Sequence, residues 1–243
     1  MNIYVQTHDK GIHLIEAFQS LFNKYWAVTQ PVTILGYAEP DFELAPNFSF
    51  ISLGKDTGPA IGTDLIDFFS GIEDKPFVYT VYSQVIIRRV LTRLFEYLAY
   101  LIEGSDRVGR IALTGDMEVN QPYSLMPLSN SSLAEHSQTS NYRMSVIWSI
   151  WSKGYFLKYL EPDMDLWQWE TEGSEQAKGD GAQILSNTGT YPITCCRLYK
   201  RGLLHAGSFR SWDKYWAEMA EEDQVFVRRI MRGPTWRVAG ESV

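Results

Sequence analysis

A cluster of tryptophans and carboxylates in residues 141–173 is the part of the sequence best suited to chemistry. In the run Trp-Gln-Trp-Glu-Thr-Glu, Trp167 and Trp169 alternate with polar residues and lead directly to Glu170 and Glu172. Aromatic ring faces cover the C–H surfaces of sugars, and carboxylate oxygens accept hydrogen bonds from sugar hydroxyls. The cluster therefore favours carbohydrate binding, and Glu170 and Glu172 are the candidate catalytic residues.

The same stretch has a structural alternative, in which an amphipathic helix buries its aromatic side chains in a core. The apolar spacing predicts a helix over residues 142–160, and we expect Trp148 and Trp151 to be core residues of that helix. For Trp167, Trp169 and Glu170, which follow the predicted helix, ligand binding and core packing both remain open.

Polar side chains follow the predicted strands at the places where a ligand usually lies in an open α/β sheet. Thr7, His8 and Asp9 follow the first strand and are candidates for contact with a base or ribose. The alternative is a turn in which Asp9 caps the next helix. Arg88 and Arg89 follow the fourth strand, where a guanidinium could bind a diphosphate, although such arginines are often on a solvated helix face.

Asp116 and Glu118 follow the fifth strand as an Asp-x-Glu pair. Two carboxylates could hold Mg²⁺ or Mn²⁺ against a diphosphate, but an exposed turn explains so short a pair equally well. Other familiar chemistry has no motif in this sequence. It contains no Gly-x-Gly-x-x-Gly dinucleotide fingerprint, no Walker A run, no Gly-x-Ser-x-Gly elbow and no zinc-type spacing of His with Cys.

The elements that must position these residues alternate between strand and helix. Hydrophobic patterning predicts strands over residues 2–7, 32–37, 48–53, 76–81 and 110–113, with a strand pair over 190–204. It predicts helices over residues 12–26, 62–71, 84–102, 142–160 and 211–232. This order indicates a single α/β domain with a mixed, mostly parallel sheet flanked by helices.

Composition limits the partners. The chain has 243 residues with 45% hydrophobic residues and a net charge of -7, which argues against a general nucleic-acid binder. Its two cysteines, Cys195 and Cys196, are adjacent and imply no disulfide framework, so a reducing, cytoplasmic location is expected. No signal peptide and no transmembrane segment are predicted.

Three stretches give the chain a resemblance to a known family. They are the opening strand, turn and helix over residues 3–26, the run over 75–113 from Pro-Phe-Val-Tyr-Thr to Val-Gly-Arg-Ile-Ala-Leu, and residues 142–174. The third stretch combines Tyr-Arg, a Trp-bearing segment, a Pro-containing acidic turn, Trp-Glu and Gly-Ser. In these stretches the chain resembles small nucleotide-sugar-dependent glycosyltransferases of the GT-A type.

The resemblance implies a single GT-A-like domain, with residues 1–116 as the nucleotide-sugar half and 117–243 as the acceptor half. It implies a nucleotide-diphosphate sugar donor, a carbohydrate or other hydroxyl acceptor, and Glu170 as the catalytic base with Glu172 as the next choice. The substrate-binding residues are then Thr7, His8, Asp9, Tyr82, Ser83, Arg88, Trp167 and Trp169.

One departure from the family concerns the metal. The family's acidic Asp-x-Asp-like pair should follow the strand 76–81, where this chain has Tyr82 and Ser83. We expect either a metal-independent enzyme or one in which Asp116 or Glu118 supplies the ligand to Mg²⁺ or Mn²⁺. The alternatives are a non-catalytic carbohydrate- or nucleotide-binding protein on the same fold and, last, an unrelated α/β hydrolase or phosphatase.

Overall fold

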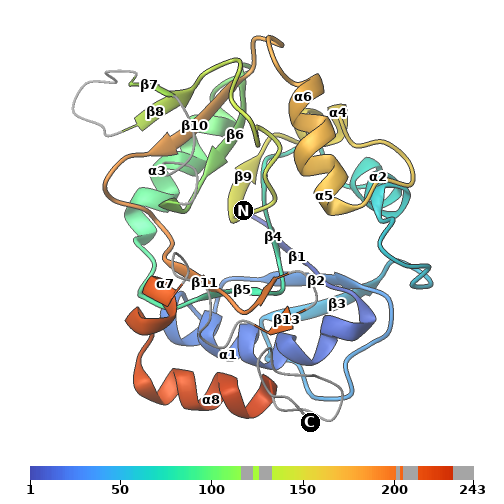
Figure 1. The fold of residues 1–243 in the computed structure, drawn as a ribbon, viewed down its shortest axis with the longest axis vertical. Helices are drawn as coiled ribbons and strands as arrows, with labels where there is room; N and C mark the ends of the chain where they lie inside the picture. The colour runs from blue at the N-terminus through green and yellow to red at the C-terminus, as the bar shows by residue number, and fades with distance from the viewer. Residues whose placement is uncertain (116–122, 126–132, 201–202, 205–212, 232–243) are drawn as a thin grey trace.

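Nine strands form one sheet at the centre of the molecule, and helices cover both of its faces (Figure 1). The computed structural model describes residues 1–115, 123–125, 133–200, 203–204 and 213–231. In spatial order the strands are β3 (Phe48–Ser52), β2 (Val32–Gly36), β1 (Ile3–Gln6), β4 (Phe77–Val81), β9 (Ser149–Trp151), β6 (Val108–Ala112), β10 (Gln183–Asn187), β8 (Leu133–His136) and β7 (Tyr123–Leu125).

Most strands of this sheet run in one direction. β3, β2, β1 and β4 are parallel neighbours, and β6 is parallel to β10. β9 is antiparallel to both β4 and β6, which makes β6 parallel in direction to β4, and β8 is antiparallel to β10. The carboxyl ends of β1, β2, β4, β6 and β10 therefore meet at one edge of the sheet. The predicted mixed, mostly parallel α/β architecture is confirmed.

The helices are short and surround this sheet. They are α1 (Ile15–Tyr25), α2 (Gly62–Gly71), α3 (Thr92–Glu103), α4 (Lys153–Lys158), α5 (Leu166–Gln168), α6 (Ser174–Gln176), α7 (Asp213–Glu218) and α8 (Glu221–Met231), with a 3-10 helix at Asp9–Leu14. Two small ladders pair β5 (Gln84–Ile86) with β11 (Cys195–Arg197) and β12 (Tyr199–Lys200) with β13 (Leu203–Leu204). No helix in the described ranges is long and apolar enough to cross a bilayer.

The core has two parts, one on each face of the sheet. Successive side chains of a strand point to opposite faces, and in β1 all of them are buried, as expected for a central strand of a covered sheet. Ile3 and Val5 pack with α1 and with Trp148, whereas Tyr4 packs with α2 and α4 through Phe69 and neighbouring rings. The second part is unusually aromatic, and it includes Phe77, Tyr79, Trp151, Phe156 and Trp169.

The helix predicted over residues 142–160 is wrong for most of its length. Residues 149–151 form β9, the strand between β4 and β6, and helical structure is confined to Lys153–Lys158. β9 is buried on both faces, so its consecutive apolar residues lose the alternation that marks a half-buried strand and mimic helical spacing. The expected burial of Trp148 and Trp151 is confirmed.

Two other predicted helices are divided. Residues 84–102 begin with strand β5, because the branched run Val85-Ile86-Ile87 favours extended backbone, and α3 starts only at Thr92. The segment 211–232 contains two helices, α7 and α8, in its described part. The strand pair predicted over 190–204 is present as β12 and β13, while β11 pairs with the distant β5.

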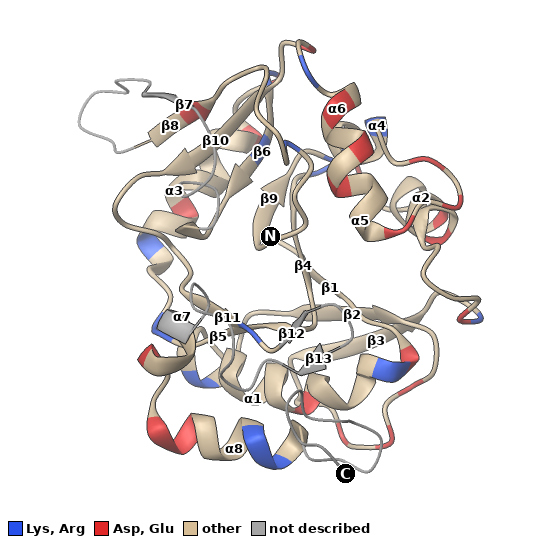
Figure 2. Cartoon of the chain, viewed as in Figure 1, with Lys and Arg blue, Asp and Glu red and all other residues tan. Residues whose placement is uncertain are grey.

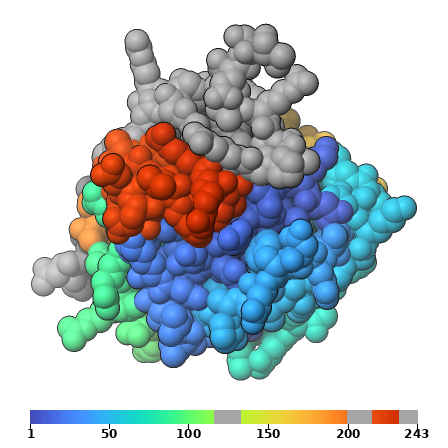
Figure 3. Space-filling model, turned by 90° about the horizontal axis from the view of Figure 1, so that it is seen from below, coloured from blue at the N-terminus to red at the C-terminus, as the bar shows by residue number. Residues whose placement is uncertain are grey.

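Helix α8 docks the end of the described chain onto α1. Its first turn is acidic and its last turn basic, which complements the helix dipole and is visible as red and blue ends in Figure 2. Buried Asp223 accepts hydrogen bonds from Lys24 Nζ at 2.7 Å and from the hydroxyl of Tyr25. Figure 3 shows α8 lying against the N-terminal part of the molecule, which this anchor explains.

Candidate functional site

The carboxyl ends of β1 and β4 lie side by side. Gln6 pairs with Val81 in the parallel ladder, and the Tyr82 amide donates to the Gln6 carbonyl at 3.0 Å. Beyond the strands, His8 Nε2 and the Tyr82 hydroxyl are 3.0 Å apart, and the two rings meet edge to face. Residues 7–9 and the Tyr82–Ser83 turn therefore lie at one edge of the sheet.

Most of these side chains are packed rather than open to a ligand. Thr7, Tyr82 and Ser83 are buried, and the Tyr82 ring lies directly against Gly11. His8 is half-buried, and burial lowers the pKa of its imidazole below the usual value, although the nearby Asp56 carboxylate opposes that effect. A neutral imidazole and the exposed Asp9 carboxylate are therefore what this part of the edge presents to a ligand.

Asp9 fastens the loops that follow the first two strands. Its Oδ1 accepts a hydrogen bond from the Ala38 amide at 3.0 Å, and its own amide donates to Asp56 Oδ2 at 3.3 Å. The 3-10 helix that follows has His8 at its N-cap position and no side-chain cap. The alternative in which Asp9 caps this helix is therefore wrong.

A divalent cation has no evident ligand set in the described part of the chain. The turn after β4 reads Tyr82-Ser83 and contains no carboxylate. Among the described residues, no group of three or more His, Cys, Asp or Glu side chains could hold a metal ion. Asp116 and Glu118, the other predicted metal ligands, lie outside the described residues. The described residues therefore do not fit a metal site.

Glu170 is positioned by a distorted helical segment. Asp165 and Gln168 form a capping box, with the Gln168 amide donating to Asp165 Oδ1 at 2.7 Å. Residues Trp169–Gly173 then adopt a π-helical turn, a local distortion frequently found at functional sites. The hydroxyl of Ser174 donates to the Glu170 carbonyl and in turn accepts from the Met144 amide at 3.0 Å.

The Glu170 carboxylate is held at the same edge of the sheet as His8 and Tyr82. Its Oε1 accepts hydrogen bonds from the Val146 amide at 2.8 Å and from Ser145 Oγ at 3.1 Å. These residues lead into β9, whose antiparallel direction brings its amino end to the carboxyl edge of β4 and β6. Among the described residues, none donates a hydrogen bond to Oε2.

A purely structural role for Glu170 would be an ion pair with Arg143 or Lys153, but both cations have other partners. Arg143 Nη2 donates to Asp180 Oδ1 at 3.0 Å in a buried ion pair. Lys153 Nζ donates to the carbonyls of Ile72 and Ser70. Glu170 is therefore not an ion-pair anchor for either cation.

The two tryptophans beside Glu170 differ completely. Trp167 is 67% exposed, and it lies three residues before Glu170, on the same side of the helical segment. Trp169 is 0% exposed, and its ring packs against Phe156 at 4.6 Å and Trp151 at 5.5 Å between centroids. The expectation of two ligand-facing indoles is corrected, because Trp169 is a core residue. Glu172 is exposed.

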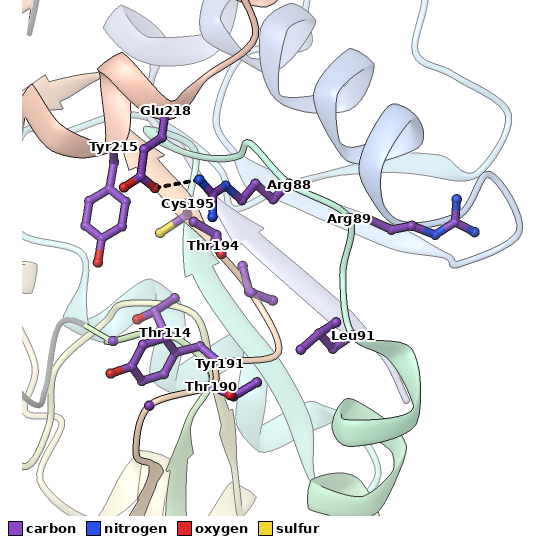
Figure 4. A pocket seen from close by; sticks show the side chains of 13 residues that line it. Arg88, Arg89, Leu91, Thr114, Thr190, Tyr191, Thr194, Cys195, Tyr215 and Glu218 are labelled. Atoms are coloured by element: carbon purple, nitrogen blue, oxygen red, sulfur yellow. Dashed lines mark ion pairs between the residues drawn. The ribbon is translucent and has the colours of Figure 1, made fainter.

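A cavity of about 410 Å³ lies at the carboxyl ends of β6 and β10. Four segments line it: the link between β5 and α3, the turn after β6, the loop after β10, and α7 (Figure 4). Arg88 lies in its wall, but its Nη2 forms an ion pair with Glu218 Oε2 at 3.2 Å. The guanidinium predicted to bind a diphosphate is thus already paired within the protein.

This cavity and Glu170 share a short stretch of backbone. The Leu113 amide donates to the Trp148 carbonyl at 2.9 Å, which extends the antiparallel pairing of β6 and β9 beyond the strands. Gly115, two residues after Leu113, lines the cavity, and Val146, two residues before Trp148, binds the Glu170 carboxylate. The carboxylate and the cavity therefore both belong to the carboxyl edge of the sheet.

No family model and no curated protein matches the chain. Solved structures do match. The structure of residues 1–349 of TarS from S. aureus is similar to this chain, with a TM-score of 0.50 at 14% identity, over 79% of this chain and 59% of TarS 1–349. This similarity decides the fold.

The chain has the nucleotide-diphospho-sugar transferase fold. Other solved structures match at TM-scores below that of TarS. A mannosyltransferase from Pyrobaculum calidifontis, solved with GDP-Man and Mn²⁺, has a TM-score of 0.48 at 13% identity over 83% of this chain and 57% of its own. A UDP-glucose pyrophosphorylase has a TM-score of 0.46 at 11% identity, over 81% of this chain and 92% of its own. The chain spans less than two thirds of the mannosyltransferase and TarS chains.

Within this nucleotide-diphospho-sugar transferase fold, sequence reasoning missed most of the cavity. Tyr191, Thr194, Tyr215 and Glu218 belong to no motif, and they meet Arg88 only in the folded chain. The available signal was indirect: three hydroxyl side chains, Thr190, Tyr191 and Thr194, occur within five residues at the start of the predicted strand pair 190–204.

Proposed function

We propose that this chain is a glycosyltransferase that moves a sugar from a nucleotide-diphosphate sugar to an acceptor hydroxyl. One observation carries the proposal: in a nucleotide-diphospho-sugar transferase fold, half-buried Glu170 stands at the carboxyl edge of the sheet with Oε1 held by two hydrogen bonds and with no donor to Oε2 among the described residues. Ligands of open α/β sheets bind outside this edge. A carboxylate held there suits proton transfer from a bound hydroxyl.

In the proposed reaction, Glu170 Oε2 removes the proton of the acceptor hydroxyl. The acceptor oxygen attacks the anomeric carbon of the donor sugar, and the bond from that carbon to the phosphate oxygen breaks. The nucleoside diphosphate leaves with the bonding electron pair. The hydrogen bonds from Val146 and Ser145 to Oε1 hold the carboxylate in place. Trp167, exposed beside it, is the candidate surface for sugar stacking.

The donor half of the proposal comprises residues 1–116, with 117–243 as the acceptor half. His8 and Asp9 are the accessible polar groups at the ends of β1 and are the candidates for contact with the nucleoside. Thr7, Tyr82 and Ser83 shape that end by packing beneath them. Because Cys195 and Cys196 are adjacent in the sequence and imply no disulfide framework, we assign the activity to a reducing compartment, the cytoplasm.

The decisive test replaces Glu170 by glutamine, which keeps the shape and the bonds to Oε1 but removes the base. We expect turnover with a nucleotide-sugar panel to fall by roughly a hundredfold or more, while nucleoside-diphosphate binding and melting temperature hold. Glu172→Gln, two residues on and exposed, is the matched control and should retain activity. A loss of melting temperature with unchanged turnover per folded molecule would make Glu170 a structural anchor.

We also expect turnover to survive chelation of divalent cations, because Tyr82 and Ser83 occupy the positions of the expected acids. The measurement is initial rate with EDTA against the rate with added Mn²⁺. Activity that EDTA abolishes and Mn²⁺ restores would contradict this expectation and direct attention to Asp116 and Glu118.

A second candidate function is a non-catalytic carbohydrate- or nucleotide-binding protein on the same fold. The buried Tyr82 and Ser83 favour it, since they leave the turn after β4 without a group that could interact with a diphosphate through a metal. The two functions differ in one measurement. A binding protein shows a ligand-dependent thermal shift but no release of nucleoside diphosphate from any sugar nucleotide.

A further inference from the structure

We propose that the cavity at the carboxyl ends of β6 and β10 is a binding site for a neutral saccharide, which serves as the acceptor in the reaction proposed above. The identity of the ligand class rests on the cavity itself, and its role as acceptor rests on the proposed function. With about 410 Å³, the cavity falls in the size range of small-molecule sites.

The lining matches the chemistry of a sugar. Five of its side chains carry a hydroxyl: Thr114, Thr190, Tyr191, Thr194 and Tyr215. Hydroxyls both donate and accept, as sugar hydroxyls do, so the two sets can pair in many orientations. Figure 4 shows Tyr215 above and Tyr191 below, with Thr114 beside Tyr191 and Thr194 beside Cys195. Aromatic rings in such positions provide apolar area for the C–H faces of a sugar ring.

The charges favour a neutral ligand over an anion. Arg88 and Glu218 neutralise each other in the cavity wall through their 3.2 Å ion pair. The guanidinium of Arg89 extends away from the tyrosines and threonines in Figure 4. A phosphate or carboxylate ligand would have to compete with Glu218 for Arg88, whereas a paired guanidinium and carboxylate can still donate to and accept from neutral hydroxyls.

The cavity is preformed, because contacts within the protein hold its lining. The loop after β10 is tied on both sides by backbone hydrogen bonds of 3.0 Å, from the Ile87 amide to the Thr194 carbonyl and from the Ile193 amide to the Leu113 carbonyl. Tyr191 lies against Gly115, where a side chain would leave no room for its ring. A preformed site loses less conformational entropy on binding, which suits a weakly held sugar.

The location fits an acceptor. Cavity residue Gly115 lies two residues after Leu113, whose amide donates to the Trp148 carbonyl, and Val146, whose amide binds Glu170, lies two residues before Trp148. We therefore assign the cavity to the acceptor, at the same edge of the sheet as the carboxylate proposed to remove its proton.

The test titrates the full-length chain with glucose, galactose, mannose and N-acetylglucosamine, and separately with inorganic pyrophosphate, by thermal shift. We expect at least one sugar to raise the melting temperature in a concentration-dependent way, and Tyr191→Ala to weaken its binding by about tenfold or more. Tyr191→Phe and Thr194→Val, which keep the packing, separate loss of hydroxyls from misfolding. Tyr100→Ala, an exposed tyrosine on α3, is the control that should change nothing.

The outcomes are distinct. The proposal is overturned if no sugar of the panel gives a shift that depends on Tyr191, or if pyrophosphate binds at Tyr191 in place of the sugars. A UDP or GDP titration on the same variants reports on the donor separately. Sugar binding without any nucleotide binding would refute the proposed function but support the saccharide site. Nucleotide binding without sugar binding would refute the saccharide site but leave the proposed function standing.

Discussion

Two glycine–tyrosine contacts at the carboxyl edge of the sheet have nearly the same geometry and opposite consequences. A methyl group added at Gly11 would lie 2.5 Å from the ring of Tyr82, and one at Gly115 would lie 2.6 Å from the ring of Tyr191. Tyr82 is 5% exposed and bonded to His8, whereas Tyr191 is half-buried and lines the cavity. At Gly11 the tyrosine ring fills the space at the ends of β1 and β4, the closed half of the edge. At Gly115 it forms part of the wall of the cavity at the ends of β6 and β10, the open half.

The difference teaches that position at the carboxyl edge does not by itself make a binding site. At β1 and β4, the ring of Tyr82 fills the space over Gly11, and only His8 and Asp9 remain accessible. At β6 and β10, the loop after β10 and helix α7 stand apart from the strand ends and enclose a cavity. Whether packing leaves room decides what the edge can bind.

The largest expected effect concerns the sheet interior on the side of β6 and β10, where His136 is buried together with Arg110 and Arg143. Burial, with a smaller contribution from Arg110 and Arg143, lowers the pKa of His136 from 6.5 to about 4. Because the folded value is below the unfolded one, the associated stability is complete above pH 6.5 and is lost as pH falls toward 4. The loss amounts to roughly 3 kcal/mol.

Urea unfolding at several pH values between 7.5 and 4 measures this loss. His136→Gln, whose amide reaches the position of Nε2, keeps a partner for the Ser186 hydroxyl, which lies 3.1 Å from His136 Nε2, and removes the titration. The difference in unfolding free energy between wild type and variant should change by that amount across the window. A difference independent of pH would show that His136 is not the titrating group.

Next in size is Gly11→Ala, which tests the closed half. The buried Tyr82 ring has no space to move into, so we expect a loss of about 1–3 kcal/mol in unfolding free energy. Gly154→Ala in α4 is the matched control, because open space surrounds that position and alanine favours a helix, so stability should hold or rise. Equal unfolding free energies for the two variants would show that the Tyr82 ring does not fill the space at the ends of β1 and β4.

The smallest effect on stability is expected for Gly115→Ala, the counterpart in the open half. Tyr191 can swing into the cavity, so we expect the unfolding free energy to fall by less than about 1 kcal/mol while saccharide affinity drops by about tenfold. Chemical unfolding and a sugar titration measure the two quantities. A stability loss equal to that of Gly11→Ala would remove the distinction between the halves.

Part of this protein could be predicted from local patterns. Alternating strand and helix signals gave the α/β class, and the continuous apolar run Phe77–Val81 marked a central strand. The family resemblance led to Glu170, which the fold places at the carboxyl edge of the sheet. Local sequence carries such information because side-chain periodicity reflects which faces an element buries.

Other features depended on contacts between distant segments. Ser149–Trp151 became a strand because β4 and β6 supply its hydrogen-bond partners on both sides, and no local pattern contains those partners. Trp167 and Trp169 are two residues apart, yet one is exposed and the other fills the aromatic core, since only the packing of Phe156 and Trp151 distinguishes them. The cavity likewise exists because four separate segments meet, which is a property of the tertiary structure alone.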